Sequence, residues 1–540
     1  MKKALALILA LVMTMSLVAC GGGNNAPEDE KSDAPATTTP TVPTTQTSTG
    51  EKPEAPSDEN KDRIAHLAVN AEFNSLDPHN TTALISLEVL ANVYEGLVFV
   101  DFDNGGEVVP KLAESYTVSD DGKVWTFKIR QGVKFHDGTD MTVEDVVYSF
   151  QRVMNPETST VTKWANGIVD VKAEGTDTVV ITLDNSRAAF LANISNLWIM
   201  SKAFVEAAGG DVATKINGTG PYKALSADLA TGVELAAFDG YWGEAPAIAG
   251  ATYDVIKDAA TQAMALEGGD LDFIMSSHAL YSDFEAMDGV EVGLVPTYHT
   301  IYVCFNPNVE PFDDVRVRQA FAYLINNEET SIALFEGYAE TDGLVLNHNI
   351  LGLPSYDEMK QFDYEYNVEK GLALLKEAGY DLEKEPLNVG AILTYPENHY
   401  ITKACPVIQA QLAQHNIIVE IDAREVSSFA ADLYAGNFSM GMAGGSWGAD
   451  ASMYHILVEK GNGSNFFQWS DPACTDLFLQ AELELDAEKR ADLYLEAIKI
   501  IMEAMPGKSV GHKYNTYAWS EDLVPALRMN QYFLSEWTWK

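Results

Sequence analysis

Cysteine is scarce in this chain, which has four among its 540 residues. One of them, Cys20, lies close to the N-terminus. The other three are an odd number without C-x-x-C spacing, so the pattern gives neither a disulfide framework nor a zinc site. We therefore expect buried free thiols at Cys304, Cys405 and Cys474.

Basic residues are also few. The chain has 35 lysine and arginine residues against 79 aspartate and glutamate residues, for a net charge of −44. Such a balance repels the phosphates of nucleic acids and disfavours wide contact with anionic lipid surfaces. No nucleic-acid partner is therefore expected. Acidic pairs such as Asp120-Asp121 are typical of turns and helix caps, and they identify no substrate.

Sequence motifs for cofactor chemistry are missing. The chain has no G-x-x-x-x-G-K-[ST] phosphate loop and no G-x-G-x-x-G after a predicted strand. Its ten histidines include no H-x-x-x-H pair and none beside clustered carboxylates, which leaves a metal site unsupported. We expect neither a cofactor nor a metal.

One weak catalytic pattern is present. Residues 444–448 spell G-x-S-x-G around Ser446, the turn that exposes a nucleophilic serine in many hydrolases. Asp471 or Asp476 and then His512 follow in the chain order that hydrolases use. The pattern arises often by chance, and no HGGG-type oxyanion loop precedes it. A serine hydrolase using Ser446 is thus a minor alternative, and no catalytic residue is predicted.

The N-terminus has the features of an export signal. Lys2 and Lys3 precede an apolar run that is shorter than the roughly 20 residues that span a bilayer, which predicts a signal peptide over 1–19. The residues before Cys20 resemble the lipobox of bacterial lipoproteins, which implies a diacylglyceryl group on that cysteine. Residues 20–61 have no aromatic side chain and a single valine, so we expect a Thr/Pro-rich tether.

The remaining body alternates strand and helix patterns, which favours an α/β fold of at least two domains. Residues 124–129 alternate between apolar and polar, and 170–183 read as two strands joined by a Gly-Thr-Asp turn. Helical spacing follows Asp313 or Asp314 and also Asn367, each a candidate N-cap, and a further helix is expected over 486–506.

The stretch "GGSWGAD" (444–450) also has the chemistry of a binding site. An aspartate at a cleft wall forms charge-assisted hydrogen bonds to the α-ammonium group of a free peptide, and a nearby tryptophan offers a flat apolar face. Asp450 and Trp447 fit these roles. Asp450 also fits as the N-cap of a following helix, and the two roles are compatible.

Several stretches together resemble the peptide/nickel/opine family of solute-binding proteins that serve ABC importers (extracellular solute-binding proteins, family 5). The match spans almost the whole chain after the tether, and its most specific part is residues 110–156. The other matching stretches are SLDPH (75–79), VYEGL (93–97), NGTGPYK (217–223), GYWGEAPAI (240–248), ALEGGDLDF (265–273), FNPNVEPFDDVRVRQAFAY (305–323) and NVEKGLALLKEAGY (367–380).

This resemblance implies a two-lobed α/β fold like that of periplasmic binding proteins, of the large cluster C type, with an extra β-rich subdomain. Two hinge strands join the lobes, and ligand closes the cleft between them. The implied ranges are 62–303 plus 510–540 for lobe I, about 100–220 for the subdomain within it, 304–509 for lobe II, and 300–306 and 509–517 for the hinges.

In peptide-binding members a W-x-A-D motif holds the ammonium group of the ligand, which implies that role for Asp450, with Trp447 lining the pocket. Tyr302, Asn306 and Tyr514 are further implied cleft residues. The implied protein is not an enzyme but a monomeric, lipid-anchored receptor at the extracellular or periplasmic face of the membrane. It binds a short peptide and delivers it to ABC permease subunits.

The chain departs from that family pattern directly after the motif. Many peptide binders continue with tyrosine and an Asp-Pro pair, whereas here residues 451–454 are Ala-Ser-Met-Tyr. Peptide length and side-chain preference are therefore open. A nickel chelate, an opine, a sugar or another small solute is the alternative ligand on the same fold.

Overall fold

The computed structural model describes residues 62–101, 106–446, 448–529 and 531–540. The predicted signal peptide (1–19) and the whole predicted tether (20–61), with Cys20, lie outside these residues. Within the described part of the chain, no helix is both long enough and apolar enough to cross a membrane.

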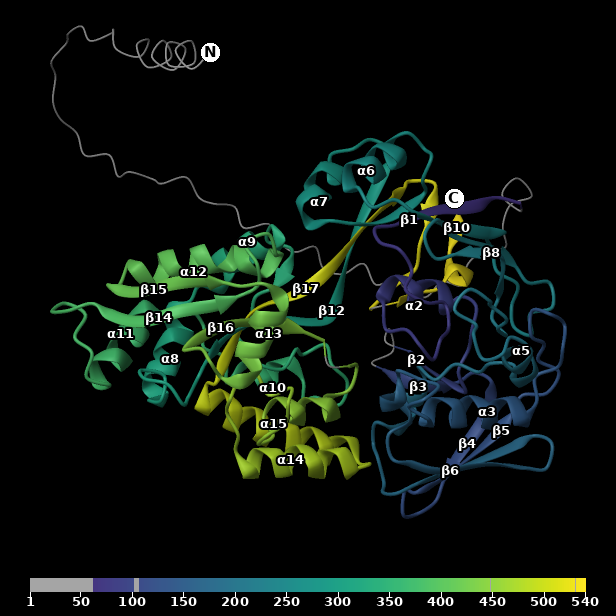
Figure 1. The fold of residues 1–540 in the computed structure, drawn as a ribbon, viewed down its shortest axis with the longest axis horizontal. Coiled ribbons are helices and arrows are strands. Elements are labelled where there is room, and N and C mark those ends of the chain that lie inside the picture. The colour runs from purple at the N-terminus through teal and green to yellow at the C-terminus, as the bar shows by residue number, and fades with distance from the viewer. Residues whose placement is uncertain (1–61, 102–105, 447, 530) are drawn as a thin grey trace, which may run out of the picture. The chain divides into compact units, whose positions relative to one another are not determined.

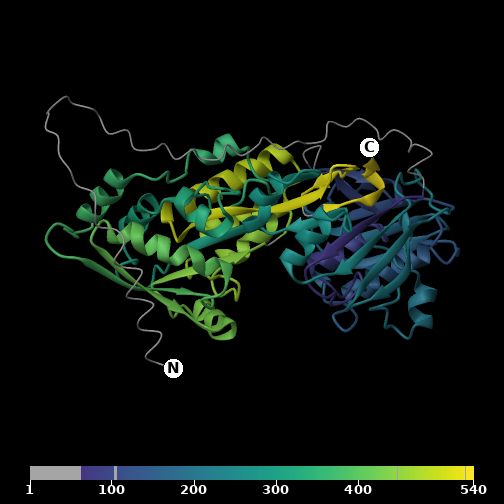
Figure 2. The same cartoon turned by 90° about the horizontal axis from the view of Figure 1, so that it is seen from above.

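A mixed sheet of eleven strands runs through the molecule, and its centre is the antiparallel pair β12 and β17. These two long strands lie side by side in Figures 1 and 2. The predicted hinge stretch 509–517 falls within β17, and 300–306 ends one residue beyond β12. The strand order is β15 (Ile417–Ala423), β14 (Leu387–Thr394), β16 (Met440–Gly445), β12 (Val290–Phe305), β17 (Gly507–Ser520), β11 (Phe273–Ser276), β1 (Ile64–Val69), β10 (Gly250–Val255), β9 (Gly232–Ala237) and β8 (Tyr222–Asp228), and β13 (Ala339–Glu340) pairs with β17.

The β12–β17 pair contains a bulge. Pro296 lies opposite Tyr514 and Thr300 lies opposite His512, so three residues of β12 face one residue of β17. The hydroxyl of Thr297 donates to the carbonyl of Lys513 at 2.7 Å and holds the bulge in place. Bulges redirect side chains out of the regular ladder. The side chains of residues 297–299 are therefore presented differently from those of their neighbours in β12.

A separate four-stranded antiparallel sheet forms the predicted β-rich region. Trp125, Phe127 and Ile129 are buried on one face of β5, as their alternation predicts. The strands on either side of the Gly-Thr-Asp turn (175–177) pair with each other, which confirms the predicted hairpin. The sheet order is β4 (Ala113–Val118), β5 (Val124–Ile129), β7 (Thr178–Leu183) and β6 (Ile168–Glu174), and β2 (Val98–Asp101) pairs with β3 (Glu107–Pro110) nearby.

Helix starts agree with the sequence. The side chains of Asp314, Asn367 and Asp486 each accept a backbone N–H at the start of α8 (Val315–Leu324), α11 (Val368–Glu377) and α15 (Ala487–Ala504). The remaining elements are α2 (Leu84–Leu90), α3 (Val143–Met154), α4 (Phe190–Ile194), α5 (Lys202–Ala207), α6 (Ala259–Glu267), α7 (His278–Glu285), α9 (Asn327–Phe335), α10 (Tyr356–Lys360), α12 (Ala404–Ala413), α13 (Val426–Ala435), α14 (Pro472–Leu483), the 3₁₀ helices η2 (Thr162–Ala165), η3 (Tyr400–Lys403), η4 (Ala451–Leu457) and η5 (Leu534–Glu536), and the short strands β18 (Leu523–Val524), β19 (Leu527–Arg528), β20 (Gln531–Tyr532) and β21 (Thr538–Trp539).

Buried apolar side chains gather into separate cores. One core combines residues from the first 295 positions with the C-terminal stretch after Tyr517, and another runs from Tyr298 to Val510. A third lies within 97–199, beneath the four-stranded sheet. The lobe boundaries given by the resemblance stay a prediction. The cysteines Cys304, Cys405 and Cys474 are buried free thiols, as expected.

A buried carboxyl group lies in the core beneath α2. Glu88 is 4% exposed, and the hydroxyl of Tyr532 donates to it at a long 3.4 Å. Burial raises the pKa of Glu88 to about 8, because little in the surroundings stabilises its ionised form. In the unfolded chain the same group ionises near pH 4.5. Between these pH values the folded protein retains a proton that the unfolded chain has released.

This difference makes the free energy of unfolding fall as the pH rises from about 4.5 through 8. Glu88→Gln, which cannot ionise, should flatten that decline. Relative to wild type, its free energy of unfolding should rise by at most about 1.4 kcal/mol per pH unit. Urea unfolding at pH 5, 7 and 9 measures the gain, with Glu114→Gln on the exposed side of β4 as control. An identical pH dependence in Glu88→Gln and wild type would contradict the assignment.

Candidate ligand-binding site

A cavity of about 360 Å³ lies between α2, the loop that follows it and the C-terminal stretch. Its volume is within the range of small-molecule sites. Most of its wall is apolar or aromatic. Its charged residues are the acidic Glu95 and Glu536 and the basic Lys111. The other lining residues include Leu84, Leu87, Tyr94, Phe99, Trp164, Asn196, Trp198, Tyr298, Ala449, Met529 and Phe533.

Glu95 is the buried anchor of this cavity. Its carboxylate is 3% exposed and accepts the indole N–H of Trp242 at 2.8 Å and the hydroxyls of Tyr241 and Thr219 at 2.9 and 3.0 Å. The Lys111 ammonium nitrogen lies 3.3 Å from the same group. A carboxylate has about four acceptor positions, and these four donors account for them. Glu95 therefore holds the wall together and has little capacity left for a ligand.

Separate parts of the sequence meet at this carboxylate. Glu95 belongs to VYEGL, Thr219 to NGTGPYK and Trp242 to GYWGEAPAI, three stretches that carry the family resemblance. The close approach needs a glycine, because a Cβ on Gly218 would lie 2.0 Å from the carbonyl oxygen of Val93. Stretches that are distant in sequence thus meet at one carboxylate in the cavity wall.

Lys111 is the basic side chain among the described residues that line the cavity. Its side chain is 38% exposed, and its ammonium lies 5.8 Å from the ring centre of Trp242. An ammonium has three N–H donors, and Glu95 is one acceptor. The remaining donors suit an anionic group of a ligand. Glu536, the second lining carboxylate, forms a two-bond pair with Arg528, with both N–O distances at 2.9 Å.

Asp450 lies next to the cavity without lining it. Ala449, one residue earlier, is in the wall. Asp450 is 5% exposed, and Arg490 donates to both of its oxygens, at 2.5 and 3.0 Å. Its Oδ1 also accepts the N–H of Ser452, which confirms the predicted N-cap role, although the element is a 3₁₀ helix. The ion pair was not predicted, and the contact of Asp450 with a ligand stays a prediction.

Two further predicted ligand residues form hydrogen bonds within the protein. Tyr302 is fully buried, and its hydroxyl donates to the carbonyl of Val345 at 2.9 Å. The side-chain amide of Asn306 donates to the carbonyls of Gly436 and Phe438, both at 2.9 Å. Neither residue lines the cavity. Tyr302 thereby ties β12, and Asn306 the residue directly after it, to neighbouring segments, and a ligand role for them stays a prediction.

The last two predicted ligand residues differ in status. Trp447 lies outside the described residues, so its proposed role as a pocket wall stays a prediction. The hydroxyl of Tyr514 donates to Glu340 at 2.8 Å, away from the cavity wall.

Two charged residues of the cavity, Glu95 and Lys111, were not predicted from the sequence. A signal for Glu95 existed, since it is a single charge within an otherwise apolar stretch, 93–97.

The structure does not bring together the residues of the hydrolase alternative. His512 lies 2.9 Å from Asp342 through Nε2 and 2.9 Å from Thr300 through Nδ1, so it is committed elsewhere. Asp471 caps α14. The histidine near Ser446 is instead His299, with Oγ and Nδ1 3.4 Å apart. Burial lowers the pKa of His299 to about 4, and no carboxylate of the described residues is hydrogen-bonded to its ring.

Comparison with known proteins places the chain in a family. Residues 107–465 match the family model of bacterial extracellular solute-binding proteins, family 5 (middle region). The dipeptide-binding protein of Escherichia coli K12 is 29% identical over 441 residues, which cover 75% of this chain and 81% of the relative. The glutathione-binding protein GsiB of Salmonella paratyphi A is 32% identical over 376 residues, covering 68% and 70%.

The fold is also found among solved structures. The ABC transporter substrate-binding protein CtaP of Listeria monocytogenes superposes with a TM-score of 0.79 at 20% identity, covering 89% of this chain and 99% of CtaP. This likeness confirms the predicted two-lobed α/β fold. The relatives are binding proteins rather than enzymes, which agrees with the expectation that this chain catalyses no reaction. The chain belongs to family 5 of the bacterial extracellular solute-binding proteins.

Proposed function

We propose that the chain captures short peptides in the cavity beside Glu95 and delivers them to the permease subunits of an ABC importer. The cavity carries this proposal, because it combines aromatic walls with a partly exposed lysine and lies directly against Ala449 of the W-x-A-D motif. The named ligands of the relatives, a dipeptide and glutathione, are short peptides. We further propose a monomer, attached through lipidated Cys20 to the extracellular or periplasmic face of the cell membrane.

A peptide is zwitterionic, so its capture away from water requires a partner for each terminus. Lys111 is the proposed partner of the terminal carboxylate. Its orientation is fixed by Glu95, which removes part of the entropy cost of ordering a lysine on binding. Asp450 is the proposed partner of the terminal ammonium. Among the described residues its Oδ2 accepts one hydrogen bond, from Arg490, which leaves room for a second.

The remaining walls suit a ligand with variable side chains. Trp164, Trp198 and Phe533 offer flat apolar surfaces rather than a fixed set of polar contacts. Selectivity then comes from the charged termini and from the length between them. Closure of the lobes around ligand is part of the proposal, and a mostly open population becomes mostly closed when ligand favours the closed form by about 5 kcal/mol.

Lys111→Met tests the carboxylate contact. The probes are the tightest-binding member of a panel of di- and tripeptides and its C-terminal amide, measured by calorimetry. Wild type should prefer the free acid by about 10-fold or more, since a hydrogen bond to a charged group contributes about 1.5 kcal/mol or more. In Lys111→Met the two probes should bind equally. Lys202→Met on exposed α5 is the matched control. A persistent preference for the free acid in Lys111→Met would exclude this contact.

Asp450→Asn tests the ammonium contact in the same way, with the N-acetylated form of that peptide as the second probe. We expect acetylation to weaken binding to wild type by about 10-fold or more and to have little effect on binding to the variant. Comparing two probes on one variant separates this effect from any loss of stability due to unpaired Arg490. Should acetylation weaken binding to wild type and variant alike, the ammonium is held by another group. Glu536→Gln then identifies whether that group is the second carboxylate of the cavity.

A further inference from the structure

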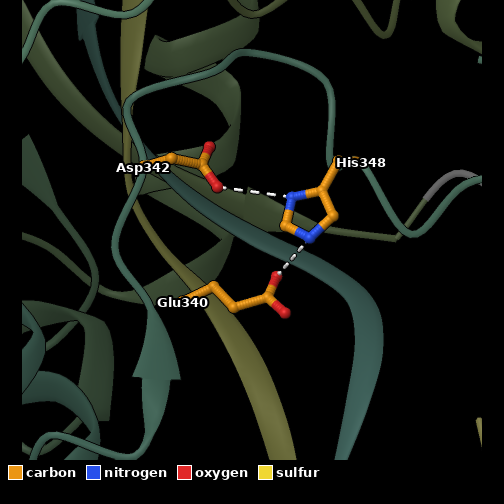
Figure 3. Close-up of side chains that lie close together, drawn as sticks. All are labelled: Glu340, Asp342 and His348. Carbon is orange, nitrogen blue, oxygen red and sulfur yellow. Dashed lines mark ion pairs between the residues drawn. The ribbon is translucent and has the colours of Figure 1, made fainter. Parts of the chain in front are cut away.

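Three potential metal-ligating side chains lie together near strand β17, away from the ligand cavity (Figure 3). Glu340 ends β13, and Asp342 and His348 belong to the loop that follows. The imidazole of His348 lies between the two carboxylates, with its Nε2 3.2 Å from Glu340 and its Nδ1 3.4 Å from Asp342. One ligand atom from each residue falls within 4.8 Å of the others.

Each carboxylate of this cluster is held by a second set of polar groups. His512 Nε2 lies 2.9 Å from Asp342. The hydroxyl of Tyr514 and the amide of Asn349 donate to Glu340 at 2.8 and 3.0 Å. Outer partners of this kind fix ligand orientation in metal sites and strengthen metal affinity. The cluster therefore has an organised outer layer in addition to its three candidate ligands.

The charge of the cluster also suits a cation. A metal ion binds carboxylates in their ionised form and imidazole in its neutral form. A divalent ion held by Glu340, Asp342 and His348 would therefore complete an electrically neutral set.

A second cavity, of about 400 Å³, is lined by Asp342 and by Tyr356, whose ring lies 4.4 Å from that of His348. Further acidic groups in its wall include Asp363 and Glu365. Glu340 and His348 keep 21% and 18% of their side chains exposed. Binding one ion through all three residues requires the His348 ring to turn, because its two nitrogens face different carboxylates. It also requires the three ligand atoms, which lie within 4.8 Å of one another, to move closer together.

We propose that Glu340, Asp342 and His348 bind a divalent transition-metal ion of the zinc class, with water completing the coordination. The imidazole favours zinc, nickel or copper over magnesium and calcium, which prefer oxygen ligands alone. No part of this proposal depends on peptide binding at the first cavity.

Such an ion would act on the strand pair at the centre of the sheet. Its outer partners His512 and Tyr514 belong to β17. Asn347, adjacent to His348, donates to the carbonyl of Thr297 in the β12 bulge at 2.8 Å. Tyr298, the next residue, lines the ligand cavity. Bound metal therefore connects loop 341–350 more rigidly to the bulge that presents Tyr298.

The test is a titration of the chelator-treated full chain with Zn²⁺, followed by calorimetry and by metal content after gel filtration. We expect one Zn²⁺ per chain, retained in excess Mg²⁺ and Ca²⁺. His348→Gln and Glu340→Gln should each lower the affinity at least about 10-fold, since even outer partners contribute 10- to 100-fold. His415→Gln, at a partly buried histidine after α12, should bind as wild type does.

Co²⁺ gives an independent readout. Its visible absorption bands should appear on binding to wild type and be lost in His348→Gln, whose fold is checked by circular dichroism. Binding of Zn²⁺ that is unchanged in both ligand variants, or no stoichiometric binding to wild type, would overturn the proposal. The cluster would then be a structural contact in which the imidazole ring alone joins the two carboxylates.

Discussion

The antiparallel pairing of β12 with β17 is the constraint on which the other features depend. β12 is also bonded to β16, and β17 to β11, so the sheet is continuous through this pair. The bulge in β12 brings Tyr298 to the ligand cavity, and the end of β16 leads to Ala449 in the same wall. β17 carries His512 and Tyr514, two of the three outer partners of the cluster of Glu340, Asp342 and His348. A change in the register of this pair would therefore move the cavity and the cluster together.

The cavity has a second organising feature in Glu95. A buried carboxylate is unfavourable unless its acceptor positions are filled, and here donors from two distant stretches and from Lys111 fill them. The satisfied network rigidifies the wall and positions the lysine before any ligand arrives. One buried group thus gives a physical reason why the stretches around Thr219 and Trp242 have the residues they do.

Local features were predictable from the sequence, and long-range pairings were not. The alternation of Trp125, Phe127 and Ile129 and the cap residues Asp314 and Asn367 act within a few positions, so their patterns are visible in the chain. The pair of Asp450 with Arg490 joins residues 40 positions apart, and Glu95 meets Trp242 across 147 positions. Which of the many acidic residues finds which partner depends on the tertiary fold. The resemblance correctly gave the family and fold, whereas the cavity wall had to come from the structure.

The central claim is that the cavity beside Glu95 and Ala449 receives short peptides. Mass spectrometry of the small molecules released when the purified protein is denatured tests it most directly, because no probe has to be chosen in advance. The account predicts a set of short peptides with free termini and mixed side chains, at up to one per chain, and their loss from protein that was unfolded, dialysed and refolded. Release of a metal chelate, an opine or a sugar in that amount, without peptides, would contradict it.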